Sequence, residues 1–174
     1  EFVQKVEASS SLDNIKNFWI KKNVGGEEII TKNPVSNLLE NLDEIPIFDY
    51  SNENKYYIEN NKLSNGDPII NLSKYTIMVS RGCPFKCSFC SNSYFHQLFS
   101  NKGKFVRRRS VEHVFSELVY AKNIFKNMKV ISFLDEVFVL DKKWIKAFVK
   151  EYKEKINLDF RCEFYPSIVD EEIV

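Results

Sequence analysis

Two patterns of apolar residues alternate along the second half of the chain. Short apolar runs rich in β-branched and aromatic residues predict buried strands at 75–79, 130–134 and 158–164. Apolar residues recur at helical spacing in the intervals, which predicts helices at 111–125 and 142–152. Ser110 and Asp141 precede these two stretches and are residue types that cap helix N-termini. Alternating strands and helices predict parallel strands joined by right-handed crossovers.

The first 72 residues are less regular. Gly25 and Gly26 separate two stretches with strand-like composition, which predicts a hairpin over 18–32. Further on, Pro46 restricts the residues before it to extended conformations, as in a connecting segment. At the other end of the chain, Asp170 is expected to begin a further helix.

Composition narrows the function classes. The chain has 174 residues, of which 44% are hydrophobic, as is normal for one globular domain. Its 25 Lys and Arg nearly balance 24 Asp and Glu, which gives no electrostatic reason to expect nucleic acid as a partner. No apolar run reaches the ~20 residues of a membrane span, so no membrane partner is expected. The few cysteines suit a reducing cytoplasm.

Three of the four cysteines lie within eight residues, at Cys83, Cys87 and Cys90, with the spacing C-x3-C-x2-C. A structural zinc site usually has paired thiols plus a second pair or histidines, and a disulfide framework favours an even number of cysteines in a secreted chain. Cysteine thiolates are the ligands of iron–sulfur clusters, and three of them leave one iron of a [4Fe–4S] cluster open. Cys162 lies far from this group in an apolar segment and is expected to be a buried thiol.

The segment Ser80-Arg81-Gly82-Cys83-Pro84-Phe85-Lys86-Cys87-Ser88-Phe89-Cys90 resembles the cluster loop of radical S-adenosylmethionine (SAM) enzymes. Its first five residues, Ser80 to Pro84, look most like the corresponding residues in the branch of this family that carries an N-terminal cobalamin-binding domain. Residues 106–112 resemble the start of the first barrel helix in that branch, and residues 131–138 resemble the end of its second strand. Residues 42–46 resemble its interdomain linker. The likeness to the barrel covers about residues 70–174.

This resemblance implies an α/β fold, namely a partial (β/α)6 TIM-like barrel. Residues 73–174 would form its N-terminal half, the first three β/α units. Residues 1–72 would form an irregular linker, with the hairpin, at the end of a preceding cobalamin-type domain. Three strands leave an open sheet edge, so we expect the chain to be a fragment of a longer protein. We expect this fragment to be inactive by itself.

The resemblance also implies an activity. A [4Fe–4S] cluster would reductively cleave SAM to a 5′-deoxyadenosyl radical, with cobalamin in the full-length protein and methyl transfer as the leading outcome. The substrate would be a small molecule or a peptide, and the reductant a flavodoxin or ferredoxin. Two alternatives stay open: a methylthiotransferase of the radical SAM type, and a non-catalytic zinc module in which His96 or Cys162 completes the site.

Five further residues are candidates for cofactor binding, although no catalytic residue is implied. In this family the aromatic between two cluster ligands, here Phe89, packs near the adenine of SAM. Asp135, Glu136 and Glu163 stand at strand ends, where a carboxylate would accept hydrogen bonds from the amino group of SAM. Arg81 would offset the negative charge of the cluster, whereas most of the basic run 107–109 is expected to be a solvated or salt-bridged surface.

Overall fold

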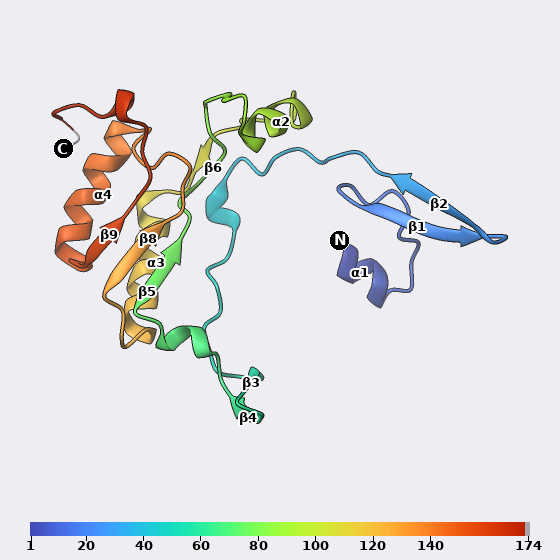
Figure 1. Ribbon diagram of the computed structural model, residues 1–174, viewed down its shortest axis with the longest axis horizontal. Coiled ribbons are helices and arrows are strands. Elements are labelled where there is room, and N and C mark those ends of the chain that lie inside the picture. Colours follow the sequence, from blue (N-terminus) through green and yellow to red (C-terminus); the bar gives the residue numbers. More distant parts are fainter. Residues whose placement is uncertain (173–174) are drawn as a thin grey trace. The chain divides into compact units, whose positions relative to one another are not determined.

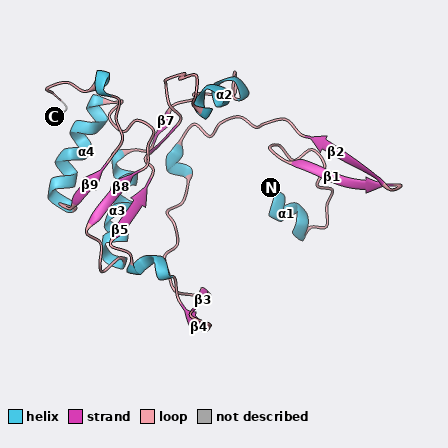
Figure 2. Ribbon diagram, in the orientation of Figure 1, coloured by secondary structure: helices cyan, strands magenta, loops and turns pink. Residues whose placement is uncertain are grey.

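The structure is a computed structural model and describes residues 1–172 (Figures 1 and 2). It divides into two compact units. Unit 1 combines Glu1–Glu40 with Phe85–Phe105, and unit 2 combines Asn41–Pro84 with the chain from Val106 onward. The two units are described separately.

Unit 2 is built on a three-stranded parallel sheet. Its strands are β5 (Lys74–Ile77), β8 (Val130–Phe133) and β9 (Asp159–Arg161), in the order β5-β8-β9. Both pairings are parallel, and the register aligns Tyr75 with Ile131 and Ile131 with Phe160. All three strands lie where the apolar runs predict them, and the predicted parallel pairing is confirmed.

Two helices follow the first two strands of this sheet. These are α3 (Val111–Ile124) and α4 (Lys142–Lys155). The Ser110 hydroxyl accepts from the backbone N–H of His113 at 3.0 Å, and an Asp141 carboxylate oxygen accepts from the N–H of Trp144 at 3.1 Å. Each bond satisfies one of the free N–H groups at a helix start, so both predicted caps are confirmed.

The core of unit 2 lies between the sheet and these helices. Alternate residues of β5 and β8 are buried there with apolar residues of α3 and α4: Tyr75, Ile77, Ile131, Phe133, Val114, Leu118 and Phe148. Burying each large apolar side chain stabilises the fold by roughly 1.5–3 kcal/mol. The residues between them form a cross-strand row, Thr76, Ser132 and Arg161, which alternation places on the opposite face.

Smaller elements complete unit 2. A short antiparallel ribbon joins β6 (Ser80–Arg81) to β7 (Arg107–Arg108), and a hairpin joins β3 (Tyr56–Glu59) to β4 (Lys62–Asn65). Single 3-10 turns lie at Leu42–Glu44, Pro68–Asn71 and Pro166–Ile168. The helix expected from Asp170 is not formed by the described residues, since 171–172 make a turn; its continuation at 173–174 lies outside them.

Unit 1 contains α1 (Phe2–Glu7), β1 (Trp19–Val24), β2 (Glu27–Lys32) and α2 (Ser91–Leu98). The strands β1 and β2 pair in antiparallel fashion across Gly25 and Gly26, whose φ angles are 62° and 91°. Glycine adopts positive φ without the steric cost that a side chain brings, which explains why two glycines stand at this turn. The hairpin predicted over 18–32 is confirmed.

The described residues thus form mixed α/β structure with two complete β/α units. Closure into a partial barrel stays a prediction. Within 1–172, no helix is long and apolar enough to cross a lipid bilayer.

Candidate functional site

The cysteine loop connects β6 to α2. Cys83 follows Gly82, whose φ of 84° turns the chain away from β6, and its side chain is buried. Cys87 and Cys90, which belong to unit 1, are half-buried. The N–H of Cys90 donates to the carbonyl of Cys87 at 3.1 Å, so these two cysteines share one tight turn.

Two polar side chains at the start of α2 contact this turn. The Ser93 hydroxyl donates to the carbonyl of Cys87 at 2.7 Å, which fixes the loop to the first turn of the helix. The Asn92 amide donates to the Cys90 sulfur at 3.7 Å. Hydrogen bonds to a ligating sulfur stabilise its thiolate form and tune the potential of a bound cluster.

The donor set suits an iron–sulfur cluster. All four cysteines are described, and none forms a disulfide bond. Thiolates on one short loop are the ligand type that such clusters take. Within residues 1–172, however, no three His, Cys, Asp or Glu side chains are gathered closely enough to hold a metal ion. The assignment of Cys83, Cys87 and Cys90 as ligands therefore depends on their chemistry and spacing.

Asp135 is fully buried, and contacts within the fold occupy its carboxylate. The backbone N–H of Val79 lies 3.1 and 3.2 Å from its two oxygens, and the Ser80 hydroxyl donates a short hydrogen bond to one of them. These bonds attach the end of β5 to the end of β8, just before the chain enters the cysteine loop. Asp135 thereby positions the start of that loop.

The spacing of apolar residues in the sequence already indicates that Asp135 faces inward, although the resemblance to a family motif does not. Side chains alternate between faces along a strand, so residues two and four apart share a face. Asp135 follows Ile131 and Phe133 at this spacing, and all three are buried. Leu134 and Glu136 alternate with them and are exposed.

The other candidate residues are exposed. Glu136 and Glu163 lie at the carboxyl ends of β8 and β9, which parallel pairing brings to the same edge of the sheet. The Glu163 carbonyl accepts from the N–H of Phe138 at 2.9 Å, and this bond ties the two strand ends together. Phe89, in unit 1, is 92% exposed. Their SAM-binding roles, and that of Asp135, stay predictions.

The prediction that most of the basic run 107–109 is a solvated or salt-bridged surface is wrong for the exposure of its last two residues, although Arg109 is salt-bridged. Arg108 donates to the carbonyl of Phe138 at 2.8 Å, and its guanidinium carbon lies 4.6 Å from the ring centroid of Trp144. Its Nη1 is buried with no hydrogen-bond partner among the described residues. Burial lowers the pKa of Arg108, and the charges of Asp135 and Asp141 partly oppose this effect.

Arg109 belongs to a buried polar network that motif reasoning missed. It pairs with Glu117 on α3 at 2.5 Å, and the Tyr75 hydroxyl donates to the other oxygen of Glu117 at 2.6 Å. Tyr50 donates to the Tyr75 oxygen at 3.3 Å. Burial, followed by its bond to Glu117, raises the pKa of Tyr75 well above its usual range. The network joins residues far apart in sequence, so no local pattern predicts it.

The segment that resembles a linker packs against α3. Leu42 is buried, and an Asp43 carboxylate oxygen accepts from the backbone N–H of Ser110 at 2.9 Å. The same oxygen lies 3.5 Å from Nδ1 of His113. Burial raises the pKa of Asp43, but the bonds from Ser110 and the charges of His113 and Arg109 outweigh it, so the pKa is lowered overall.

Cys162 directly follows β9 and is half-buried against the core. Burial raises the pKa of its thiol, and the negative charges of Glu163 and Asp135 add to this effect. A thiol with a raised pKa is a poor metal ligand and a poor nucleophile near neutral pH. The prediction of a buried thiol is met in part, because Cys162 is half-buried and lies just after β9.

Comparison with known proteins finds a relative in Pyrococcus horikoshii whose name is uncharacterized methyltransferase. It is 37% identical over 116 residues, which are 66% of this chain and 21% of that protein. The chain thus spans about a fifth of the length of this curated relative. No protein-family model and no solved structure matches the chain.

Proposed function

We propose that this chain is the cluster-binding part of a radical SAM enzyme that transfers methyl groups. The observation that carries the proposal is the group of three cysteines at C-x3-C-x2-C, which follows the first strand of a parallel β/α sheet and the short strand β6. The name of the Pyrococcus horikoshii relative supports methyl transfer as the outcome.

In this proposal Cys83, Cys87 and Cys90 hold three irons, and the fourth iron is left for SAM. When bound, such a cluster supplies the electron that breaks a carbon–sulfur bond of SAM. The Asn92 amide stabilises the Cys90 sulfur as a thiolate through the hydrogen bond described above. Asp135 holds the ends of β5 and β8 together just before the chain enters the loop.

The carboxylates at the sheet edge have different roles in this proposal. Asp135 is fully buried and its oxygens are already engaged, whereas Glu136 and Glu163 are exposed at strand ends. We therefore assign the hydrogen bonds with the ammonium group of SAM to Glu136 and Glu163. Phe89 would pack near the adenine.

The wider reaction is also a proposal. Cobalamin in the full-length protein would carry the methyl group, and a flavodoxin or ferredoxin would supply electrons. The substrate would be a small molecule or a peptide. A radical intermediate needs a site that excludes water, which the rest of a barrel would supply.

Anaerobic reconstitution with iron and sulfide tests the cluster ligands. The unaltered chain should gain the broad visible absorbance of an iron–sulfur cluster, and a variant with Cys83, Cys87 and Cys90 all replaced by alanine should not. Cys162→Ala is the matched control and should behave like the unaltered chain. Absorbance that persists in the triple variant, or purified protein that holds zinc and takes up no iron, would contradict the proposal.

A further inference from the structure

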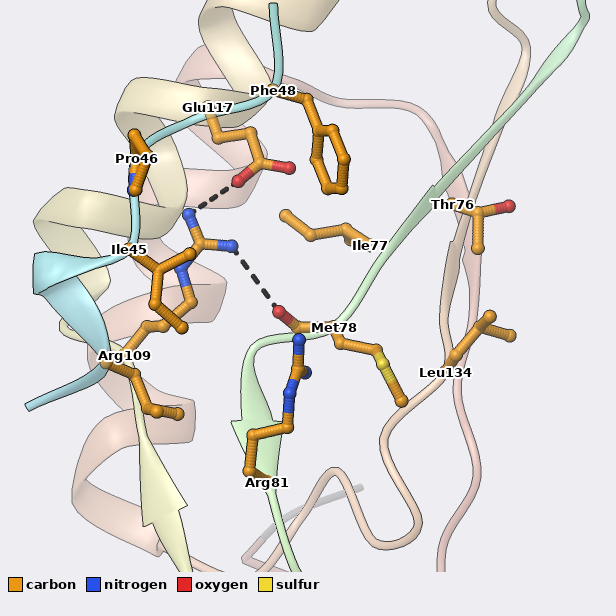
Figure 3. Close-up of a pocket in the computed structure, with 11 residues that line it drawn as sticks. Ile45, Pro46, Phe48, Thr76, Ile77, Met78, Arg81, Arg109, Glu117 and Leu134 are labelled. Atoms are coloured by element: carbon orange, nitrogen blue, oxygen red, sulfur yellow. Dashed lines mark hydrogen bonds and ion pairs between the residues drawn. The ribbon is translucent and has the colours of Figure 1, made fainter. Parts of the chain in front are cut away.

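A pocket of about 250 Å³ lies within unit 2, between the segment that follows Leu42 and the end of β5 (Figure 3). Most of its lining is apolar and comes from this segment and from the strand ends: Leu42, Ile45, Pro46, Phe48, Ile77, Met78 and Leu134. The volume lies just below the ~300–1,000 Å³ of typical small-molecule sites. The pocket thus suits a compact ligand with an apolar body.

The charged residues of this lining leave a net positive charge. Glu117 is neutralised by Arg109, which also donates to the carbonyl of Met78 at 3.4 Å (Figure 3). Arg81 has no such partner: no carboxylate of residues 1–172 lies within ion-pair distance of it. Its Nη1 donates to the carbonyl of its neighbour Ser80 at 3.0 Å, which leaves most of its donors available. The uncompensated charge favours an anionic ligand.

The ribbon that carries Arg81 places a second cation beside it. Arg81 and Arg107 are direct partners in the antiparallel pairing of β6 with β7, so their side chains share one face of the ribbon. Like charges directly opposite each other are destabilising. Burial lowers the pKa of Arg107, and the charge of Arg81 lowers it further. An anion bound at Arg81 would relieve this repulsion.

We propose that the pocket binds a small organic carboxylate, with its carboxylate on Arg81 and its apolar body against Ile45, Phe48, Met78 and Leu134. Arginine pairs with carboxylates through two parallel hydrogen bonds, which fixes the orientation of the ligand. None of the lining residues is a cysteine, so the pocket itself supplies no cluster ligand. Arg81, which the family resemblance assigns to offsetting the cluster charge, is assigned here to the carboxylate of the ligand. Ligand binding should therefore occur whether or not iron is present.

The methionines offer a direct readout, because the chain has two of them. Met78 lines the pocket, whereas Met128 packs against the core elsewhere. In protein labelled with 13C at the methionine methyl groups, 3-phenylpropanoate should shift the Met78 signal in a saturable manner and leave the Met128 signal unchanged. The alcohol 3-phenylpropan-1-ol should bind about tenfold more weakly, and 3-phenylpropylamine should not bind.

Two variants complete the experiment. Arg81→Gln should weaken binding of 3-phenylpropanoate about tenfold or more, while Arg161→Gln, at an exposed arginine outside the pocket, should leave it unchanged. The Met78 and Met128 signals in each variant show whether the fold is kept. Equal binding of the acid and the alcohol, an unchanged affinity in Arg81→Gln, or no shift of Met78 with any of the three probes would overturn the proposal.

Discussion

Replacing Asp135 should weaken the fold of unit 2 far more than replacing its neighbour Glu136. In Asp135→Ala, the Val79 N–H and the Ser80 hydroxyl both lose their acceptor in a site from which water is excluded. A hydrogen bond to a charged group is worth about 1.5–3 kcal/mol, so two of them give about 3–6 kcal/mol. Loss of the buried charge offsets part of this cost, which favours the lower end of the range.

Asp135→Asn tests the same contacts with little change in volume. The retained side-chain oxygen can still accept from Val79 and Ser80, so we expect a loss of about 1–2 kcal/mol. Glu136→Gln is the matched control, because this side chain is exposed, and its free energy of unfolding should change by less than about 0.5 kcal/mol.

Urea unfolding followed by tryptophan fluorescence measures these differences. Trp144 packs against Phe138 and Phe148 in the core of unit 2, whereas Trp19 is 67% exposed in unit 1. A Trp19→Phe background therefore isolates the signal of unit 2. If Asp135→Ala unfolds at the same urea concentration as Glu136→Gln, Asp135 is not the structural contact described above, and a direct role in binding SAM would again be open to it.

Three further predictions follow from the buried polar contacts of unit 2. The lowered pKa of Asp43 adds stability that is fully present above its unfolded pKa of ~3.9 and is lost as pH falls through the lower folded value. In acid titrations, Asp43→Asn should therefore lose less stability below about pH 4 than the unaltered chain does. Glu117→Gln leaves Arg109 as an uncompensated buried charge and should lower the free energy of unfolding, measured in urea, by about 3 kcal/mol or more. Tyr75→Phe removes one bond to Glu117 and should cost about 1.5–3 kcal/mol in the same assay, against no change for the exposed Tyr56→Phe.

The regular elements were predictable because their signals are local. Apolar spacing and the caps at Ser110 and Asp141 depend on residues within one or two turns, and both helices start where these signals place them. The strands are shorter than predicted, for a physical reason at each end. After Ile77, the N–H of Val79 bonds to a carboxylate instead of to a strand, and β9 ends at Arg161, where its pairing with Ser132 stops.

The polar contacts of the site were less predictable, because they join residues distant in sequence. Asp43 meets Ser110 across 67 positions, and Asp135 meets Val79 across 56. The burial of Arg108 similarly depends on Trp144, which no motif connects with it. Motifs identify candidate residues by type, but whether a carboxylate faces a ligand or the core depends on packing.

The most direct test of the central proposal is Mössbauer spectroscopy of anaerobically prepared protein loaded with 57Fe. The account predicts about four irons and four sulfides per chain, held by Cys83, Cys87 and Cys90, and a distinct spectrum for one iron of the four when SAM is added. A cluster whose irons all remain unchanged by SAM, or protein that binds iron without sulfide, would contradict it.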